Sequence, residues 1–159
     1  MNSKDLQQTI EFLEETPKII NREIKDLPVE ILKEKPTENE FSIHEHIWHL
    51  HDIERLGYAV RIEKLLGENE PTLQDIDGAK LAAERGYHNL DFAEGFDKFS
   101  QAREENVARL KRLSVEQLNA KGKFGDGTEI TLARLIEMMR EHDSDHRREL
   151  HDLIASLNG

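Results

Sequence analysis

The strongest constraint on the fold of this 159-residue chain is a stripe of core-type positions near its carboxyl end. The positions recur at steps of three and four, apart from one adjacent pair, which is the repeat of one face of an α-helix. The stripe consists of Leu132, Leu135, Ile136, Met139, His142, His146, Leu150, Leu153 and Leu157. It predicts one helix from about 131 to 157 that must be buried against other elements. Two histidines stand in the middle of this face.

Three more long helices are predicted upstream. Residues 4–27 carry an apolar stripe at helical spacing, and Pro17 is expected to kink or split this helix. A second helix is predicted over 42–66, because Ser42-x-x-Glu45 is a capping box in which side chains satisfy the first free amides. A third helix is predicted over 92–113 from its apolar spacing.

The segments between these helices are less regular. Residues 68–91 form a long connection for a helical bundle, with room for one short helix around 79–85. Ser114-x-x-Gln117 is a second capping box that opens a short turn, and the glycines within 121–130 predict a loop or tight hairpin. The sequence therefore predicts an all-α fold, a four-helix bundle with a long connection between the second and third long helices. We expect a single domain over 1–159.

Charge and composition exclude several classes of protein. The net charge of −11 disfavours binding to nucleic acid or to an anionic membrane surface. The absence of cysteine excludes disulfides, thiolate nucleophiles and cysteine-based zinc sites. No segment is apolar enough to span a bilayer, and no signal-peptide stretch follows Met1, so we expect a cytoplasmic protein without a membrane partner.

His142 and His146 lie four residues apart on the predicted last helix. Side chains at this spacing share one face, with Cβ atoms about 5–6 Å apart, so their imidazoles can bind one metal ion. Their place in an apolar stripe supports this interpretation, because a buried imidazole without a partner costs desolvation free energy. The alternative is a pair of core histidines that hydrogen-bond to Asp or Glu.

Four more histidines, His44, His46, His49 and His51, crowd the start of the second helix. Successive helix positions turn by about 100°, so these side chains cannot all face the core. The predicted inward positions of this helix are Ile43, Ile47, Leu50, Ile53, Gly57 and Val60. His49 is the first candidate for a third, inward ligand, and His46 is the alternative on the same face. We expect His44 and His51 to be solvated.

Acidic residues flank the histidines, and most of them are expected to lie on solvated helix faces. These residues are Asp52, Glu54, Asp143, Asp145 and Glu149. One or two of them are expected to hold the second ring nitrogen of a ligand histidine. Motifs of other chemistries are absent from the sequence: the Gly-x-Ser-x-Gly elbow, the Walker loop, paired Glu-x-x-His motifs of di-iron bundles and the His-Glu-x-x-His of zinc proteases.

In order and spacing, these motifs resemble the DinB/YfiT-like family of metalloenzymes, which fold as four-helix bundles. The matching segments are Phe41-Ser42-Ile43-His44-Glu45-His46-Ile47-Trp48-His49-Leu50, Asp52-Ile53-Glu54, Arg61-Ile62 and Glu141-His142-Asp143-Ser144-Asp145-His146. In that family, one histidine before a leucine on the second helix joins two histidines on the last helix. The resemblance implies His49, His142 and His146 as metal ligands, a divalent ion such as zinc or nickel, and a homodimer.

The resemblance also implies a reaction, because characterised relatives include bacillithiol-dependent transferases and mycothiol-dependent isomerases. Our first hypothesis is a metal-dependent thiol S-transferase with a small-molecule thiol and an electrophilic substrate as partners, the substrate entering beside residues 68–91. Hydrolase or isomerase activity ranks below it. The alternatives are a non-catalytic metal-binding stress-response module and a helical dimerisation scaffold. Because imidazole binds metals only when neutral, metal affinity is expected to fall as the pH drops through about 6.

Overall fold

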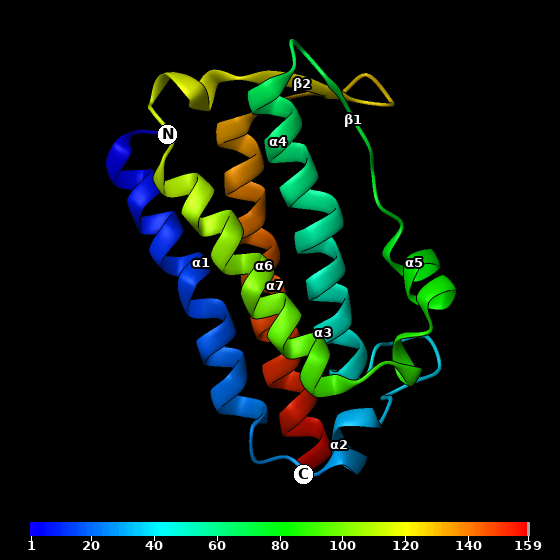
Figure 1. Cartoon of the computed structure of the whole chain (residues 1–159). Coiled ribbons are helices and arrows are strands. Elements are labelled where there is room, and N and C mark those ends of the chain that lie inside the picture. Colours follow the sequence, from blue (N-terminus) through cyan, green and yellow to red (C-terminus); the bar gives the residue numbers. More distant parts are fainter. Residues whose placement is uncertain (159) are drawn as a thin grey trace.

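A computed structural model describes residues 1–158, and its four long helices lie side by side as a bundle (Figure 1). The long helices are α1 (Ser3–Ile24), α3 (Ile43–Asp52) continuing into α4 (Ala59–Gly67), α6 (Phe92–Lys111) and α7 (Leu132–Asn158). Both α1 and α3 pack against α6 and α7. The predicted four-helix bundle is confirmed. No helix in the described part of the chain is long and apolar enough to cross a membrane.

Short elements lie at the two ends of the bundle and along its α3 side. They are α2 (Val29–Lys33), β1 (Thr72–Leu73), α5 (Gly78–Arg85), β2 (Lys121–Phe124), β3 (Glu129–Thr131) and 3₁₀ turns at Tyr87–Asn89 and Glu116–Asn119. In the small sheet, β1 is parallel to β2, and β2 is antiparallel to β3. The sheet lies at the end of the bundle where α4 ends and α7 begins (Figure 1). The hairpin is confirmed, whereas β1 is too short to show a strand pattern in the sequence.

The long connection between α4 and α6 has a geometric cause. The helix formed by α3 and α4 runs in the same direction as α6, its neighbour in the bundle (Figure 1). A helix over residues 43–67 is about 37 Å long at 1.5 Å per residue, so the chain must return by that length before α6 begins. Residues 68–91 make this return, and on the way they form β1 and place α5 against α3.

Both predicted capping boxes are present. The Glu45 amide donates to Ser42 Oγ at 3.1 Å, and the Ser42 amide donates to Glu45 Oε1 at 3.2 Å, which starts α3. The Ser114 amide donates to Gln117 Oε1 at 2.9 Å, and the Gln117 amide donates to Ser114 Oγ at 3.3 Å. These reciprocal bonds fix where the two segments begin to turn.

A π-helical turn at Ile53–Tyr58 separates α3 from α4. Such a turn adds one residue, so the inward face of the helix shifts by about 100° beyond it. As a result Tyr58 and Ile62 are buried, whereas Val60 is 41% exposed. The predicted inward position of Val60 is therefore wrong, because the prediction assumed an unbroken helical repeat.

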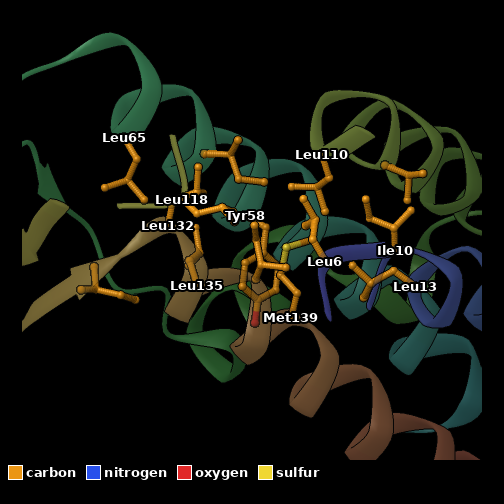
Figure 2. Packing of buried hydrophobic residues seen from close by; sticks show 14 of the residues in the cluster. Leu6, Ile10, Leu13, Tyr58, Leu65, Leu110, Leu118, Leu132, Leu135 and Met139 are labelled. Carbon is orange, nitrogen blue, oxygen red and sulfur yellow. The ribbon is translucent and has the colours of Figure 1, made fainter. Parts of the chain in front are cut away.

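A polar layer divides the core into two apolar clusters. The cluster at the sheet end, drawn in Figure 2, includes Leu6, Ile10, Leu13, Tyr58, Leu65, Leu110, Leu118, Leu132, Leu135 and Met139. The cluster at the opposite end comprises Ile20, Ile24, Leu32, Ile43, Ile47, Leu50, Phe99, Leu150 and Leu153. The buried side chains between them are Thr16, Glu54, Arg103, Asn106 and Asp143. All four long helices contribute to this layer.

Arg103 is the centre of the polar layer, and all five of its N–H donors are used. Its Nε and Nη2 donate to the Glu54 carboxylate at 2.8 and 2.9 Å, and its Nη1 and Nη2 donate to Asp143 at 2.6 and 2.8 Å. Burial by itself lowers the pKa of Arg103, but the two carboxylates outweigh burial and raise it. Glu54 and Asp143 are therefore not on solvated helix faces, because both are buried as partners of Arg103.

Pro17 lies inside α1 without splitting the helix. Proline has no N–H, so the carbonyl of Leu13, four residues earlier, lacks its helical donor. Arg103 Nη1 donates to this carbonyl at 2.9 Å. The polar layer therefore satisfies the carbonyl that Pro17 leaves free, and the predicted split of the helix is wrong.

Replacing Arg103 with Met keeps an unbranched side chain but leaves two buried carboxylates without their cation. We expect Arg103→Met to lower the free energy of unfolding by about 3–5 kcal/mol, measured by urea denaturation. Arg134→Met is the matched control, because it removes an exposed pair with Glu141. Its urea midpoint is expected to match the wild type. Similar midpoints for the two variants would contradict the role given to the buried layer.

Candidate metal centre

The structure brings together the three predicted metal ligands. His49, His142 and His146 each offer one ring nitrogen, and these atoms all lie within 4.8 Å of one another. The Nε2 atoms of His142 and His146 are 3.0 Å apart. The ring of His49, from α3, has its centroid 5.0 Å from that of His146 and 5.9 Å from that of His142. The i,i+4 pair on α7 thus faces one histidine across the bundle.

These histidines suit a divalent metal ion. Burial, reinforced by the neighbouring His146, lowers the pKa of His49 to about 4 and that of His142 to about 3. Burial also lowers the pKa of His146. Neutral imidazoles carry the lone pairs that bind metals. The Nδ1 atom of His49 is buried without a hydrogen-bond partner, and in general such an atom is stabilised by a partner or a metal. The donor set therefore fits a zinc-like cation.

Two further side chains adjoin this set. Glu149 Oε2 lies 3.2 Å from His146 Nδ1, so one of the flanking acidic residues does approach a ligand ring nitrogen, as predicted. The Tyr58 ring lies 5.9 Å from that of His142. Burial raises the pKa of Tyr58 to about 12, which keeps its hydroxyl protonated. Sequence reasoning missed Tyr58, because only the π-helical turn brings it to the inner face.

Of the other three histidines of α3, His44 and His51 are less exposed than predicted. His44 is 1% exposed and packs its ring 5.7 Å from that of Phe92, so the prediction that it is solvated is wrong. His51 is half-buried, and its Nδ1 lies 2.8 Å from a carboxylate oxygen of Asp52. His46, the alternative ligand, is buried with its ring 5.5 Å from that of His146. The His46 ring therefore lies next to the set formed by His49, His142 and His146.

The long connection covers the His49 side of the site. A Cβ atom at Gly78, the first residue of α5, would lie only 3.0 Å from Cε1 of His49, so the His49 ring would have to move slightly to admit any other residue. The connection is held in place by Asp52, which accepts a hydrogen bond from the Tyr87 hydroxyl at 2.7 Å and forms an ion pair with Arg85 Nε at 2.7 Å. Asp52 is buried like Glu54 and Asp143, so the prediction that most of the five flanking acidic residues are solvated is wrong.

A pocket of about 620 Å³ opens on the other side of the site. His46 and His146 form part of its wall, and Ala79 of the long connection forms another part. Its remaining lining residues are Pro36, Asn39, Glu40, Phe41, Glu149, Asp152, Leu153 and Ser156. Within residues 1–158, no lysine or arginine lines this pocket. Its walls are therefore acidic and partly apolar.

The lowered pKa values predict how acid affects the metal-free protein. The unfolded chain binds protons on histidine below about pH 6.5, whereas folded His46, His49 and His142, with pKa values of about 3, 4 and 3, do not. These three histidines therefore make their full contribution to the free energy of unfolding above pH 6.5. The free energy of unfolding is expected to fall toward pH 4 by up to about 1.4 kcal/mol per pH unit for each histidine. Urea denaturation in chelator measures this slope.

The change of the free energy of unfolding with pH is then compared in His49→Gln and in a control, His88→Gln. His88 lies at an exposed position in a 3₁₀ turn. We expect a shallower slope for His49→Gln and the wild-type slope for His88→Gln. An unchanged slope for His49→Gln would contradict the burial of a neutral ring. Because these rings stay neutral well below pH 6, the loss of metal affinity expected near pH 6 from the sequence is now expected at lower pH.

The contact between Gly78 and His49 predicts a second outcome. Gly78→Ala would press a methyl group against the His49 ring and turn it from its position. We expect an affinity for zinc about tenfold weaker, the size of effect usual for groups that orient a ligand. Gly125→Ala is the control, since a Cβ atom there meets nothing within 4 Å. Competition with a chromophoric chelator gives both affinities, and equal values would argue against the orienting contact.

Comparisons with known proteins agree with this architecture. YfiT from Bacillus subtilis, described as "a probable metal-dependent hydrolase with an unusual four-helix bundle topology", matches with a TM-score of 0.90 and 17% identity, over 99% of this chain and 90% of that chain. The DinB-like protein YjoA from the same organism has a TM-score of 0.64 and 18% identity, over 96% of this chain and 93% of that chain. No functionally curated protein matches the sequence. The model of the DinB superfamily matches residues 13–150, and this chain therefore belongs to the DinB superfamily.

Proposed function

We propose that this chain is a divalent-metal-dependent enzyme in which His49, His142 and His146 hold zinc or nickel. The observation that carries the proposal is a set of three ring nitrogens within 4.8 Å of one another, beside a pocket that opens to solvent. Three histidine ligands leave a coordination position free, which is the arrangement of catalytic rather than structural zinc sites. The pocket argues against the closed site expected of a non-catalytic metal-binding module.

The residues around the histidines have defined roles in this proposal. A bound divalent cation supplies Lewis acidity, which lowers the pKa of a coordinated water or thiol. Glu149, half exposed at the pocket wall, faces Nδ1 of His146 and would orient this ligand from the side away from the ion. The protonated Tyr58 hydroxyl donates a hydrogen bond toward negative charge that develops next to His142.

Hydrolysis is the first candidate reaction. The description of YfiT as a probable metal-dependent hydrolase favours water as the nucleophile. Carboxylates at Glu40, Glu149 and Asp152 repel anions, so we propose a neutral or cationic substrate. Phe41 and Leu153 offer apolar surface for the rest of that molecule.

Thiol S-transfer is the second candidate. The chain has no cysteine, so a sulfur nucleophile must arrive as a small-molecule thiol, and the resemblance to thiol-dependent relatives favours this reaction. The acidic pocket would accept a neutral thiol more readily than one that carries several carboxylates. The homodimer and the cytoplasmic location stay predictions.

The first test is metal content. We expect untagged protein, purified and dialysed, to retain about one zinc or nickel ion per chain in elemental mass spectrometry. His142→Ala removes a ligand and is expected to lose the ion, while His151→Ala, at an exposed position on the same helix, is expected to keep it. Circular dichroism confirms that both variants fold. Wild-type protein without metal, even after incubation with zinc, would favour the scaffold alternative.

The same three proteins then distinguish the reactions. Hydrolysis of neutral and cationic ester and amide probes is compared with conjugation of an electrophile to a small thiol. Under the hydrolase proposal, wild type and His151→Ala release product without thiol, and His142→Ala loses at least a hundredfold in rate. A rate that requires thiol would support S-transfer instead. Equal rates in all three proteins would refute a role for the metal site.

A further inference from the structure

His146 has a neighbour at each of its two ring nitrogens. Its Nε2 lies 3.0 Å from His142 Nε2, on the side of the proposed catalytic ion. Its Nδ1 is buried and lies 3.2 Å from Glu149 Oε2, but this contact does not have the geometry of a hydrogen bond. A ligand to the first ion needs only one ring nitrogen, so the second nitrogen of His146 remains available to another group.

His46 completes a second set of ligand atoms on this side. One atom each from His46, His146 and Glu149 lie within 4.8 Å of one another. His46 is 8% exposed, and its Nδ1 is buried with no hydrogen-bond partner in the described part of the chain. A buried polar atom without a partner is destabilising, so a structure rarely keeps one without a reason. A cation would provide the missing partner.

The surroundings of this second set suit a cation that enters from solvent. All three residues line the 620 Å³ pocket, together with the carboxylates of Glu40 and Asp152. Glu149 is half exposed, so its carboxylate reaches both water and the buried imidazoles. Two imidazole nitrogens and a carboxylate oxygen favour zinc-like ions over magnesium or calcium, which prefer oxygen ligands alone.

We propose that His46, His146 and Glu149 form a second divalent-cation site that shares the His146 ring with the first. The inference rests on the proposed metal site at His49, His142 and His146, and it extends that site into the substrate pocket. A neutral imidazole has one lone pair, so His146 bridges two ions only after its remaining N–H proton passes to solvent. The imidazolate and the Glu149 carboxylate then balance the charge of the second ion. No electrons are transferred.

The test counts zinc ions on the untagged full-length protein. Each variant is dialysed to equilibrium against increasing free zinc at neutral pH, and bound zinc is measured by elemental mass spectrometry. Wild type is expected to bind two ions per chain, the second at least tenfold more weakly than the first. Glu149→Gln, at a half-exposed position that leaves the fold intact, and His46→Gln are expected to bind one ion with the affinity of the wild-type first site.

Asp152→Asn is the matched control, since Asp152 lines the pocket but is outside the ligand set. It is expected to bind two ions. A single ion in wild type would overturn the second site and leave the proposed function intact. A single zinc site whose affinity His46→Gln lowers would also overturn the second site, because His46 would then be a ligand of the first ion. A protein that binds no zinc would overturn both proposals.

Discussion

The buried guanidinium of Arg103 is the interaction on which the rest of the bundle depends. It joins Glu54 of the π-helical turn, Asp143 of α7 and the carbonyl of Leu13 that Pro17 leaves free in α1. A charged group in the core is stable only when its donors have partners, so these bonds favour the register and rotation in which Glu54, Asp143 and the Leu13 carbonyl all reach Arg103. One cation between two carboxylates also leaves a formal negative charge close to His142, which favours a metal cation in the adjacent site.

That register explains why the histidines face one another. Asp143 is fixed by Arg103, so the residues beside it on α7 are fixed in rotation, and His142 and His146 point toward α3. The π-helical turn lies at the same height, where it sets Glu54 against Arg103 and brings Tyr58 to the metal side. Turns of this kind often occur at functional sites, because they change the direction of side chains without ending the helix.

The sequence predicts much of this arrangement and fails at identifiable points. Capping boxes and apolar periodicity predict the four helices. The direction of His49, with His46 as the alternative, and the spacing of His142 and His146 predict the three imidazoles whose ring nitrogens lie within 4.8 Å of one another. Val60 was misplaced because a π-helical turn leaves no periodic signal. The burial of Glu54 and Asp143 could not be predicted, because their partner, Arg103, is distant in sequence. An acidic residue is expected to be solvated unless such a partner is known.

The contact between Gly78 and His49 makes access to the site one-sided. The backbone of α5 closes the His49 edge, while the pocket opens along His46 and His146. Under the proposed function, a substrate and its leaving group would use this one entrance. Glycine at position 78 thus shapes access to the histidines through the path of the backbone rather than through a side chain.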